Sequence, residues 1–338
     1  MVVVAAARIP AIGAAPLIMS LSVVAKKPSV SQSAPLKGAS RIARRQARLD
    51  MEQLITTGAT RLLLLIVDPI RSVRSPQLFN RLFSEQRRDA MCAPLHVPAE
   101  ELGVVFAGLK AIRNLDGILV TMPHKQAALN LLDDLDDTAR QVGAVSVARR
   151  ESDDSWTGAI FDGWGCVLGM RWEGIEPRGR RVLLVGAGGA GSAIAFAVAQ
   201  AGARMLTICD VAACKARQLA DSVGKAARSC DTGVGSPDAR GYDIVINATP
   251  AGMHLGDPMP IDPEQLDEGA AVVDIITKPD PTPLCAAARK RGCRAQGGAA
   301  MHEGQAVYAA RFLGLTYWPA GRPKVALPGP SPSNAAFS

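Results

Sequence analysis

The chain has 338 residues, of which 48% are hydrophobic and 20% are charged. A chain of that length is too long for a single hydrophobic core of ordinary size, so we predict two domains. The composition excludes an intrinsically disordered chain. The formal net charge is +7, yet eight basic residues and one acidic residue fall within 1–50, which leaves 30 of each sign in 51–338. A neutral body excludes the basic groove of a nucleic-acid-binding protein. No apolar run approaches the roughly 18 residues of a membrane helix, so we expect a small-molecule partner and no membrane association.

Residues 1–50 show no hydrophobic periodicity and are rich in Ala, Ser, Pro and basic residues. We favour a disordered extension that arises from a start codon placed too early, with Met51 as the true start. A transit-like peptide and a weak signal peptide are the alternatives.

Seven cysteines are scattered along the chain, and no pair has the C-x-x-C spacing. An odd number without paired spacing favours a reduced, cytoplasmic compartment over a disulfide framework. Histidines, cysteines and carboxylates do not cluster with the spacing of a zinc site, so we expect no metal.

From residue 60 onward, predicted strands and helices alternate. The first unit is expected to contain strands at 62–67, 117–122, 143–148 and 156–160, with helices at 76–89 and 124–134. The second unit is expected to contain strands at 181–185, 205–209, 244–247 and 271–274, with helices at 192–201 and 282–291 and a last helix over 299–313. Repeated β-α-β spacing predicts an α/β protein with a doubly wound parallel sheet.

A glycine-rich turn follows the strand at 181–185 and matches the pattern G-x-G-x-x-G. Its residues are Gly186, Ala187, Gly188, Gly189, Ala190 and Gly191. Glycines allow a tight turn and let backbone N–H groups approach a pyrophosphate, and the amino end of the following helix favours an anion. A strand before the turn and a helix after it are the setting of a dinucleotide site.

Asp210 ends the next strand, where an acid is able to accept hydrogen bonds from both ribose hydroxyls of NAD. The same carboxylate would repel the 2′-phosphate of NADP, and no Arg or Lys follows before Lys215. We therefore expect NAD as the cofactor and NADP as the less favoured one. The alternative interpretation is that Asp210 is an ordinary loop acid.

Lys125 and Asp162 each follow a predicted strand, at positions that line the crevice of an open α/β sheet. Oxidation of a secondary alcohol requires a base for the hydroxyl proton, which a partly buried lysine positioned by an aspartate provides. The alternative is a solvated surface ion pair.

Four segments together resemble the shikimate dehydrogenase family: 69–76 (PIRSVRSP), 120–125 (VTMPHK), 143–145 (GAV), and the stretch from Gly186 through Asn247-Ala248-Thr249 to Gly297-Gly298. They recur in the family's order and spacing over nearly all of 60–315. The resemblance implies an α/β substrate-binding domain over 51–160 and a Rossmann domain over 161–298. A helix within 299–320 is then expected to return to the substrate domain, followed by a loose tail over 321–338.

The resemblance also assigns roles to particular residues. Lys125 and Asp162 become the catalytic pair, and Ser75, Thr121, Ser146 and Gln305 match positions that bind the substrate. Thr249 and Gly298 join the glycine turn and Asp210 as cofactor-binding residues. The implied enzyme transfers a hydride between NAD and a ring secondary alcohol of a small cyclic hydroxy acid, as a monomer or homodimer.

Several positions depart from the family's pattern. Val73 replaces one serine of a pair, Leu119 replaces an asparagine, and Phe161 replaces a threonine. Ser146-Val147 stands for Asn-Thr, and Thr277 for a tyrosine. Fewer polar side chains remain to hydrogen-bond the ring hydroxyls of a substrate, so we expect a substrate other than shikimate. The alternatives are a quinate or aminoshikimate dehydrogenase, and a non-catalytic NAD-binding regulatory protein. Of the histidines, His124 and His302 flank the expected site.

Overall fold

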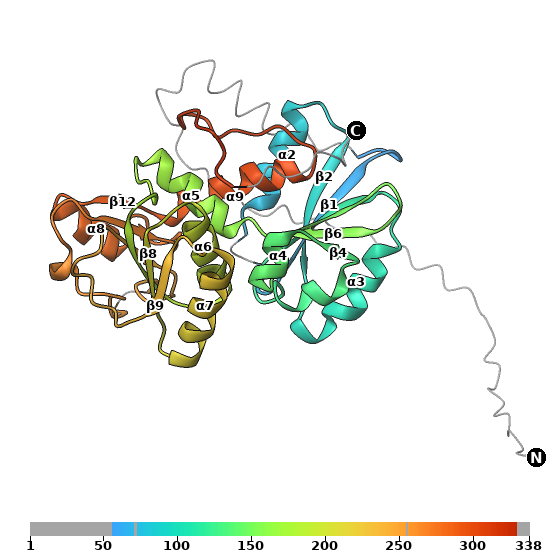
Figure 1. Ribbon diagram of the computed structural model, residues 1–338. Coiled ribbons are helices and arrows are strands. Elements are labelled where there is room, and N and C mark those ends of the chain that lie inside the picture. The colour runs from blue at the N-terminus through green and yellow to red at the C-terminus, as the bar shows by residue number, and fades with distance from the viewer. Residues whose placement is uncertain (1–55, 71–72, 255, 330–338) are drawn as a thin grey trace, which may run out of the picture. The chain divides into compact units, whose positions relative to one another are not determined.

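The computed structural model describes residues 56–70, 73–254 and 256–329. The predicted amino-terminal extension therefore lies outside the described residues, as do residues 71–72 of the segment 69–76. Two six-stranded sheets form the body (Figure 1).

The first sheet is mixed and has the strand order β2-β1-β3-β5-β6-β4. Its strands are β1 (Arg61–Val67), β2 (Ala90–His96), β3 (Leu115–Val120), β4 (Asp134–Leu135), β5 (Val147–Arg150) and β6 (Trp156–Ala159). Strand β1 runs parallel to β2 and β3, whereas β5 is antiparallel to both β3 and β6. The carboxyl ends of β1 and β3 therefore lie at one edge of the sheet, and the site is built there.

Alternation along β1 explains how both faces of this sheet are covered. Leu63 and Leu65 pack into the core that includes α2 (Ser75–Glu85), whereas Leu64 and Ile66 pack against residues of α3 (Leu102–Lys110). Successive side chains of a strand point to opposite faces, so a run of apolar residues is buried on both sides.

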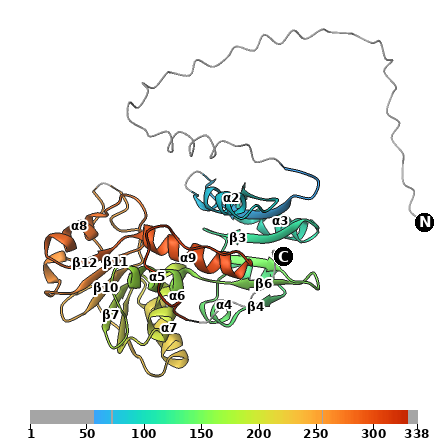
Figure 2. The ribbon, with the colours of Figure 1, turned by 90° about the horizontal axis from the view of Figure 1, so that it is seen from above.

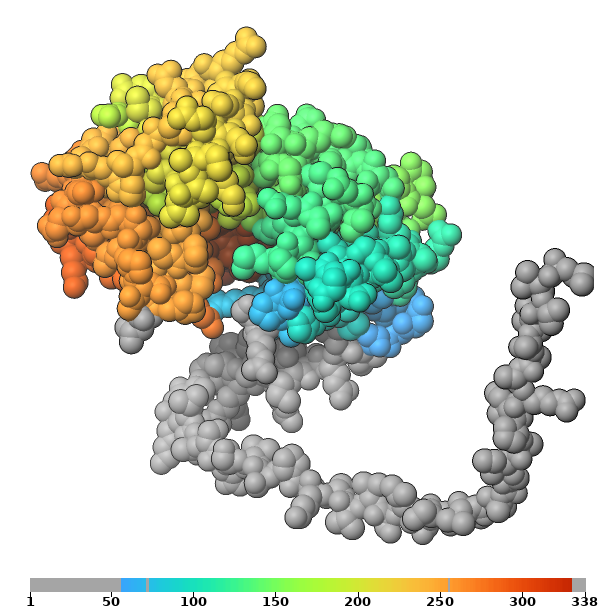
Figure 3. Space-filling view, turned by 90° about the horizontal axis from the view of Figure 1, so that it is seen from below, coloured from blue at the N-terminus to red at the C-terminus, as the bar shows by residue number. Residues whose placement is uncertain are grey.

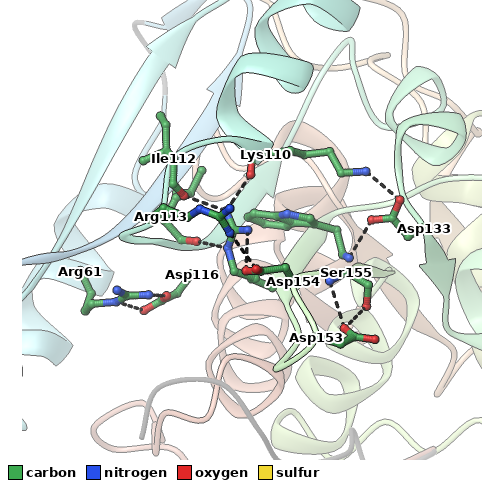
Figure 4. A network of polar contacts seen from close by, with 12 residues as sticks. Arg61, Lys110, Ile112, Arg113, Asp116, Asp133, Asp153, Asp154 and Ser155 are labelled. Atoms are coloured by element: carbon green, nitrogen blue, oxygen red, sulfur yellow. Dashed lines mark hydrogen bonds and ion pairs between the residues drawn. The ribbon is translucent and has the colours of Figure 1, made fainter.

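A polar network ties α3 to the end of the sheet opposite the site (Figure 4). The Arg150 guanidinium donates to the carbonyls of Ile112 (2.7 Å), Lys110 (3.0 Å) and Leu115 (3.0 Å). Lys110 Nζ also donates to Asp133 at 2.8 Å. These bonds satisfy the carbonyls that follow α3, and they hold the amino end of β3 in register with β5.

The second sheet is entirely parallel, with the order β12-β11-β10-β7-β8-β9. Its strands are β7 (Arg181–Val185), β8 (Met205–Cys209), β9 (Asp231–Val234), β10 (Ile244–Asn247), β11 (Ala271–Asp274) and β12 (Arg294–Gln296). Its helices include α6 (Gly189–Gln200), α7 (Ala213–Ala226) and α8 (Pro283–Lys290). Val182 and Leu184 belong to the core with α6 and α7, and Leu183 and Val185 to the core with α8. The predicted doubly wound sheet is confirmed.

Helices α5 (Asp162–Trp172) and α9 (Gly298–Phe312) lie against each other (Figure 2). Glycines make this approach close: a Cβ at Gly165 would lie less than 3.0 Å from Gln305, and one at Gly304 less than 3.0 Å from Gly165. The final helix also reaches the first sheet, because Arg149 donates to the carbonyl of Phe312 at 2.9 Å.

Several expectations differ from the structure. The strand expected at 143–148 begins only at Val147, as β5. The segment 124–134 is not a continuous helix but a turn followed by the 3₁₀ helix Ala127–Leu131. Residues 321–329, expected as part of a loose tail, make defined contacts instead. Arg322 pairs with Glu173 and Glu303, and the buried Tyr308 hydroxyl donates to the carbonyl of Pro328. Within the described residues, no helix has the length and apolar character needed to cross a bilayer.

Candidate active site

Lys125 and Asp162 meet directly. Lys125 lies in the turn after β3, and its carbonyl accepts from the N–H of Val145 at 2.9 Å. Asp162 is the first residue of α5. The ammonium of Lys125 donates to Asp162 Oδ1, with 20% of the lysine side chain and 3% of the aspartate side chain exposed. This is a largely buried pair and not the solvated surface pair that was the alternative.

The second oxygen of this carboxylate, Asp162 Oδ2, is buried and has no hydrogen-bond partner among the described residues. Burial of a charged oxygen without a partner costs free energy, which a ligand hydroxyl would recover. The site therefore contains an acceptor that the protein itself leaves unsatisfied.

A cavity of about 110 Å³ opens onto this pair. All six predicted catalytic and substrate-binding residues line it, namely Ser75, Thr121, Lys125, Ser146, Asp162 and Gln305. Ser75 and Asp162 lie at the starts of α2 and α5, and Gln305 lies in α9. The other three lie in the loops that follow β3 and precede β5. The structure thus brings together residues far apart in the sequence, and it leaves their roles as proposals.

The sequence departures fall in different places. Leu119 and Phe161 line the cavity, so two of the replacements change its wall directly. Val73 instead packs against the main core, and Thr277 is exposed on the loop after β11. The Ser146 hydroxyl accepts from the N–H of Phe161 at 3.1 Å, which fixes the strand end that precedes Asp162.

Of the two flanking histidines, only His302 lines the cavity. Burial lowers its pKa, and the nearby charge of Arg74 lowers it further, against the opposing effects of Glu303 and Asp162. His302 is therefore neutral at pH 7 and able to donate or accept a hydrogen bond. His124 is buried elsewhere, and its Nε2 has no partner among the described residues.

The glycine turn divides into structural and open positions. Gly186 has a φ of 106°, which favours glycine, and a Cβ at Gly191 would lie less than 3.0 Å from the Gly186 carbonyl oxygen. A Cβ at Gly188 or Gly189 would meet no protein atom within 4 Å. Packing therefore explains the glycines at 186 and 191, whereas Gly188 and Gly189 leave the backbone uncovered at the start of α6.

A larger cavity of about 800 Å³ lies against this turn. Among the predicted cofactor residues, Gly186, Gly188, Asp210 and Thr249 line it. Ala187, Gly189, Ala190 and Gly191 are not among its lining residues, nor is Gly298. His254 also lines this cavity and was not among the residues predicted from the sequence. No motif surrounds His254 that would have indicated this position.

Thr249 and Gly298 are both held by local contacts. The Thr249 hydroxyl donates to Asn247 Oδ1 at 2.7 Å, and Asn247 Nδ2 donates to the buried Asp274 at 3.0 Å. Burial raises the pKa of Asp274, although its hydrogen bonds to Thr282, Ile276 and Asn247 act in the opposite direction. The Gly298 N–H donates to the carbonyl of Ile276 at 3.2 Å.

The helix that begins at Asp162 lies close against the helix that begins at the glycine turn. A Cβ at Gly163, the residue after Asp162, would lie less than 3.0 Å from the carbonyl oxygen of Ala193 in α6. Helix α6 is the helix that begins at the glycine turn. No three His, Cys, Asp or Glu side chains of the described ranges gather as a metal site.

A parallel sheet with a glycine-rich turn and a mixed sheet with a buried Lys125–Asp162 pair are features of a dinucleotide-dependent dehydrogenase. The family model for the shikimate dehydrogenase substrate binding domain matches residues 65–147. "Shikimate dehydrogenase (NADP(+))" of Rubrobacter xylanophilus is 39% identical over 259 residues, covering 75% of this chain and 90% of that protein. The chain belongs to the shikimate dehydrogenase family.

Solved structures agree with this assignment. Shikimate 5-dehydrogenase from Listeria monocytogenes in complex with shikimate and NAD is 29% identical, with a TM-score of 0.70 and coverage of 75% of this chain and 91% of that chain. Quinate dehydrogenase from Corynebacterium glutamicum in complex with NAD is 30% identical, with a TM-score of 0.69 and coverage of 75% and 93%.

The prediction of NAD as cofactor is wrong by these comparisons, because the curated relatives are named as NADP(+) enzymes. The structure explains why Asp210 misled the sequence argument. Its Oδ2 accepts from the N–H of Ala187 at 2.7 Å and its Oδ1 from Ala212 at 2.8 Å. These two bonds lower the pKa of Asp210, and they engage both carboxylate oxygens with the protein backbone.

Proposed function

We propose that this protein is an NADP-dependent dehydrogenase that interconverts a ring secondary alcohol of a small cyclic hydroxy acid and the corresponding ketone. The observation that carries this proposal is the Lys125–Asp162 pair, which lines a cavity together with the other polar residues expected at the substrate site. The names of the curated relatives support the choice of cofactor.

The residues around the glycine turn fit a dinucleotide. Helix α6 begins without a side-chain cap and has no acidic residue in its first turn. The first N–H groups of a helix lack partners within the helix, so they suit a pyrophosphate. With the pyrophosphate held there, NADP would supply its nicotinamide as the hydride acceptor for alcohol oxidation.

The protein's own part in the reaction is proton transfer and positioning. Lys125 Nζ, in its amine form, accepts the proton of the reacting hydroxyl as the carbon–hydrogen bond breaks and the carbonyl forms. Asp162 Oδ1 holds the resulting ammonium. The free oxygen, Asp162 Oδ2, accepts from a neighbouring ring hydroxyl. General acid–base catalysis of this kind contributes about 10²–10⁴ in rate.

The remaining polar residues orient the substrate. Ser75 and Thr121 present hydroxyls to the cavity, and Gln305 presents an amide from α9. We assign substrate binding to the unit containing the first sheet and cofactor binding to the parallel sheet. Ser146, whose hydroxyl already accepts from the backbone, retains its own proton for a ligand oxygen.

The test is an assay of the purified full chain with NADP and a panel of ring hydroxy acids, following the absorbance of the reduced nicotinamide. Shikimate, quinate and aminoshikimate belong in the panel, since a quinate dehydrogenase is among the structural neighbours. We expect turnover of at least one acid. Binding of NADP without turnover of any of them would overturn the proposal and favour a regulatory dinucleotide-binding protein.

A further inference from the structure

The cavity at Lys125 has an apolar floor. The floor is formed by side chains from the ends of β1 and β3, from α2, from the residue before α5 and from α9. They are Leu65, Phe79, Leu119, Val120, Phe161 and Ala306. Each has 6% or less of its surface exposed, so these side chains form the deepest part of the wall.

Most polar residues of the cavity lie at its half-buried rim, which also includes the apolar Leu78 and Ala309. Ser75, Thr121, Ser146, His302 and Gln305 line the cavity but are only half-buried. Asp162 is the exception, because it is both polar and deeply buried, and it is held by Lys125. A ligand therefore meets hydrogen-bonding groups near the opening and at Asp162, and hydrocarbon elsewhere.

Positive charge is confined to the rim as well. Within the described ranges, Lys125 is the one cationic side chain that lines the cavity. Arg74, just before Ser75 and α2, is exposed and close enough to His302 to influence its protonation. Lys125 is already paired with Asp162, so Arg74 is the cation that offers a substrate carboxylate a positive charge near the opening. The carboxylate is therefore expected to stay at the rim.

The size of the cavity limits the ligand to one small ring. Its volume is about 110 Å³, and an engineered apolar cavity of about 150 Å³ takes up benzene. In Figure 3 a hollow separates the orange and green surfaces, and red surface, the colour of α9, lies at its base. The ring is thus expected to reach the α9 wall with its polar substituents toward the opening.

We infer that the preferred substrate is a ring hydroxy acid that is deoxygenated along one edge, with its carboxylate and reacting alcohol at the rim and the bare edge against Leu119 and Phe161. This inference rests on the proposed function. It adds the substrate class. The acid carries the reacting hydroxyl and an adjacent hydroxyl that donates a hydrogen bond to Asp162 Oδ2, and it has no third hydroxyl facing the floor.

The physical reason is the cost of an unpaired hydroxyl. A hydroxyl placed against the floor gives up its hydrogen bonds to water and meets only carbon atoms. A pocket of hydrocarbon rejects an added hydroxyl by up to about a hundredfold in kcat/KM. We therefore expect a ratio of about ten- to hundredfold in favour of the deoxygenated acid.

The experiment compares two substrates with the full chain and NADP. One is shikimate, which has three ring hydroxyls, and the other is its analogue without the hydroxyl on the carbon beside the ring methylene, which keeps the reacting hydroxyl next to the double bond and the hydroxyl adjacent to it. We expect kcat/KM to be at least about tenfold higher for the analogue. Equal values, or a preference for shikimate, would overturn the inference while leaving the proposed dehydrogenase intact. Failure to turn over either acid or any acid of the wider panel would instead remove the proposed function.

A variant tests the assignment of the floor. Leu119→Asn places an amide there and should lower the preference for the analogue by about tenfold, by aiding shikimate or hindering the analogue. Leu119→Met, which keeps an apolar side chain of similar volume, should leave the ratio unchanged. An unchanged ratio in folded Leu119→Asn would show that Leu119 does not face the third hydroxyl. If that variant does not fold, the ratio measured with the parent chain still decides the inference.

Discussion

Asp162 holds the ammonium of Lys125 with one carboxylate oxygen, while its other oxygen, Oδ2, stays buried without a hydrogen-bond partner among the described residues. A buried charged oxygen left unpaired normally destabilises a fold. Asp162 also lines the cavity beside Lys125. In the proposed mechanism the pair combines a base with a group that positions both the base and the substrate.

Removal of the base should affect the chemical step. In Lys125→Ala, kcat should fall by about 10²–10⁴, because no group remains to accept the hydroxyl proton. The affinity for NADP, measured by calorimetry, should stay within a few-fold, since the glycine turn is untouched. Lys110→Ala is the matched control, because Lys110 pairs with Asp133 away from the cavity. A parental kcat in Lys125→Ala would contradict the mechanism and direct attention to His302.

Replacement of the partner should have a second effect. Asp162→Asn keeps the shape but removes the negative charge that holds the ammonium and the free oxygen that accepts a hydroxyl. We expect kcat to fall and KM to rise together in steady-state kinetics, each by about tenfold or more. A change in kcat with an unaltered KM would show that Asp162 positions Lys125 and does not bind the substrate.

Two glycines of the turn should respond differently to the same change. Gly188→Ala places a methyl group in open space, so the melting temperature should hold within a few degrees while NADP binds at least about tenfold more weakly. Gly191→Ala drives a methyl group into the Gly186 carbonyl and should lower the free energy of unfolding by about 1–3 kcal/mol. Calorimetry and thermal unfolding of both variants check this pair. Unchanged NADP affinity in Gly188→Ala would argue against pyrophosphate binding at the turn.

The cap of α4 (Asp137–Val142) should make stability depend on pH. Burial raises the pKa of Asp136 to about 6, although its side chain accepts from the N–H of Ala139. Because the folded protein binds this proton more tightly than the unfolded chain, stability is lost as pH rises between about 4 and 6, by less than about 1.4 kcal/mol per pH unit.

In Asp136→Asn the amide oxygen still caps the helix, and this loss should vanish. The check is the difference in melting temperature between the parent and the variant from pH 4 to pH 7, which should shift in favour of the variant as pH rises. A difference that stays constant would contradict the assignment.

Residues 321–329 should contribute to stability. A chain ending at residue 320 loses the bonds of Arg322 and leaves the fully buried Tyr308 hydroxyl without its acceptor at Pro328. We expect the free energy of unfolding, measured in urea, to fall by about 2 kcal/mol or more. Tyr308→Phe should destabilise the full chain yet recover part of the loss in the shortened one. If Tyr308→Phe destabilises the full chain and the shortened chain to the same extent, the Tyr308 hydroxyl and residues 321–329 do not interact.

The central strands of both sheets were predictable because their cores are short apolar runs, whereas the edge strands β2, β4, β9 and β12 were not predicted. Residues 63–67 of β1 and 182–185 of β7 are buried on both faces, and such runs stand out in the sequence. The glycine turn and the Lys125–Asp162 pair were predictable for a related reason, since each follows such a strand. The order of the strands placed both at carboxyl ends of sheets.

Helix α5 was not predicted, because glycine disfavours helices and Gly163, Gly165 and Gly169 lie within it. The structure shows that each glycine permits a close contact with α6, α9 or Gln296, so tertiary packing overrides local preference. The cofactor prediction failed for a comparable reason. A carboxylate at the end of β8 was read as a ligand for ribose, but nothing in the local sequence shows that its oxygens bond to the backbone.

The contact between Gly163 and Ala193 joins the helix that begins at Asp162 to the helix that begins at the glycine turn. A displacement of α6 on binding at the glycine turn would press on the first turn of α5, because Gly163 has no side chain to separate its backbone from the Ala193 carbonyl. If occupancy of one site changes the free energy of binding at the other, thermodynamic reciprocity requires the same factor in both directions.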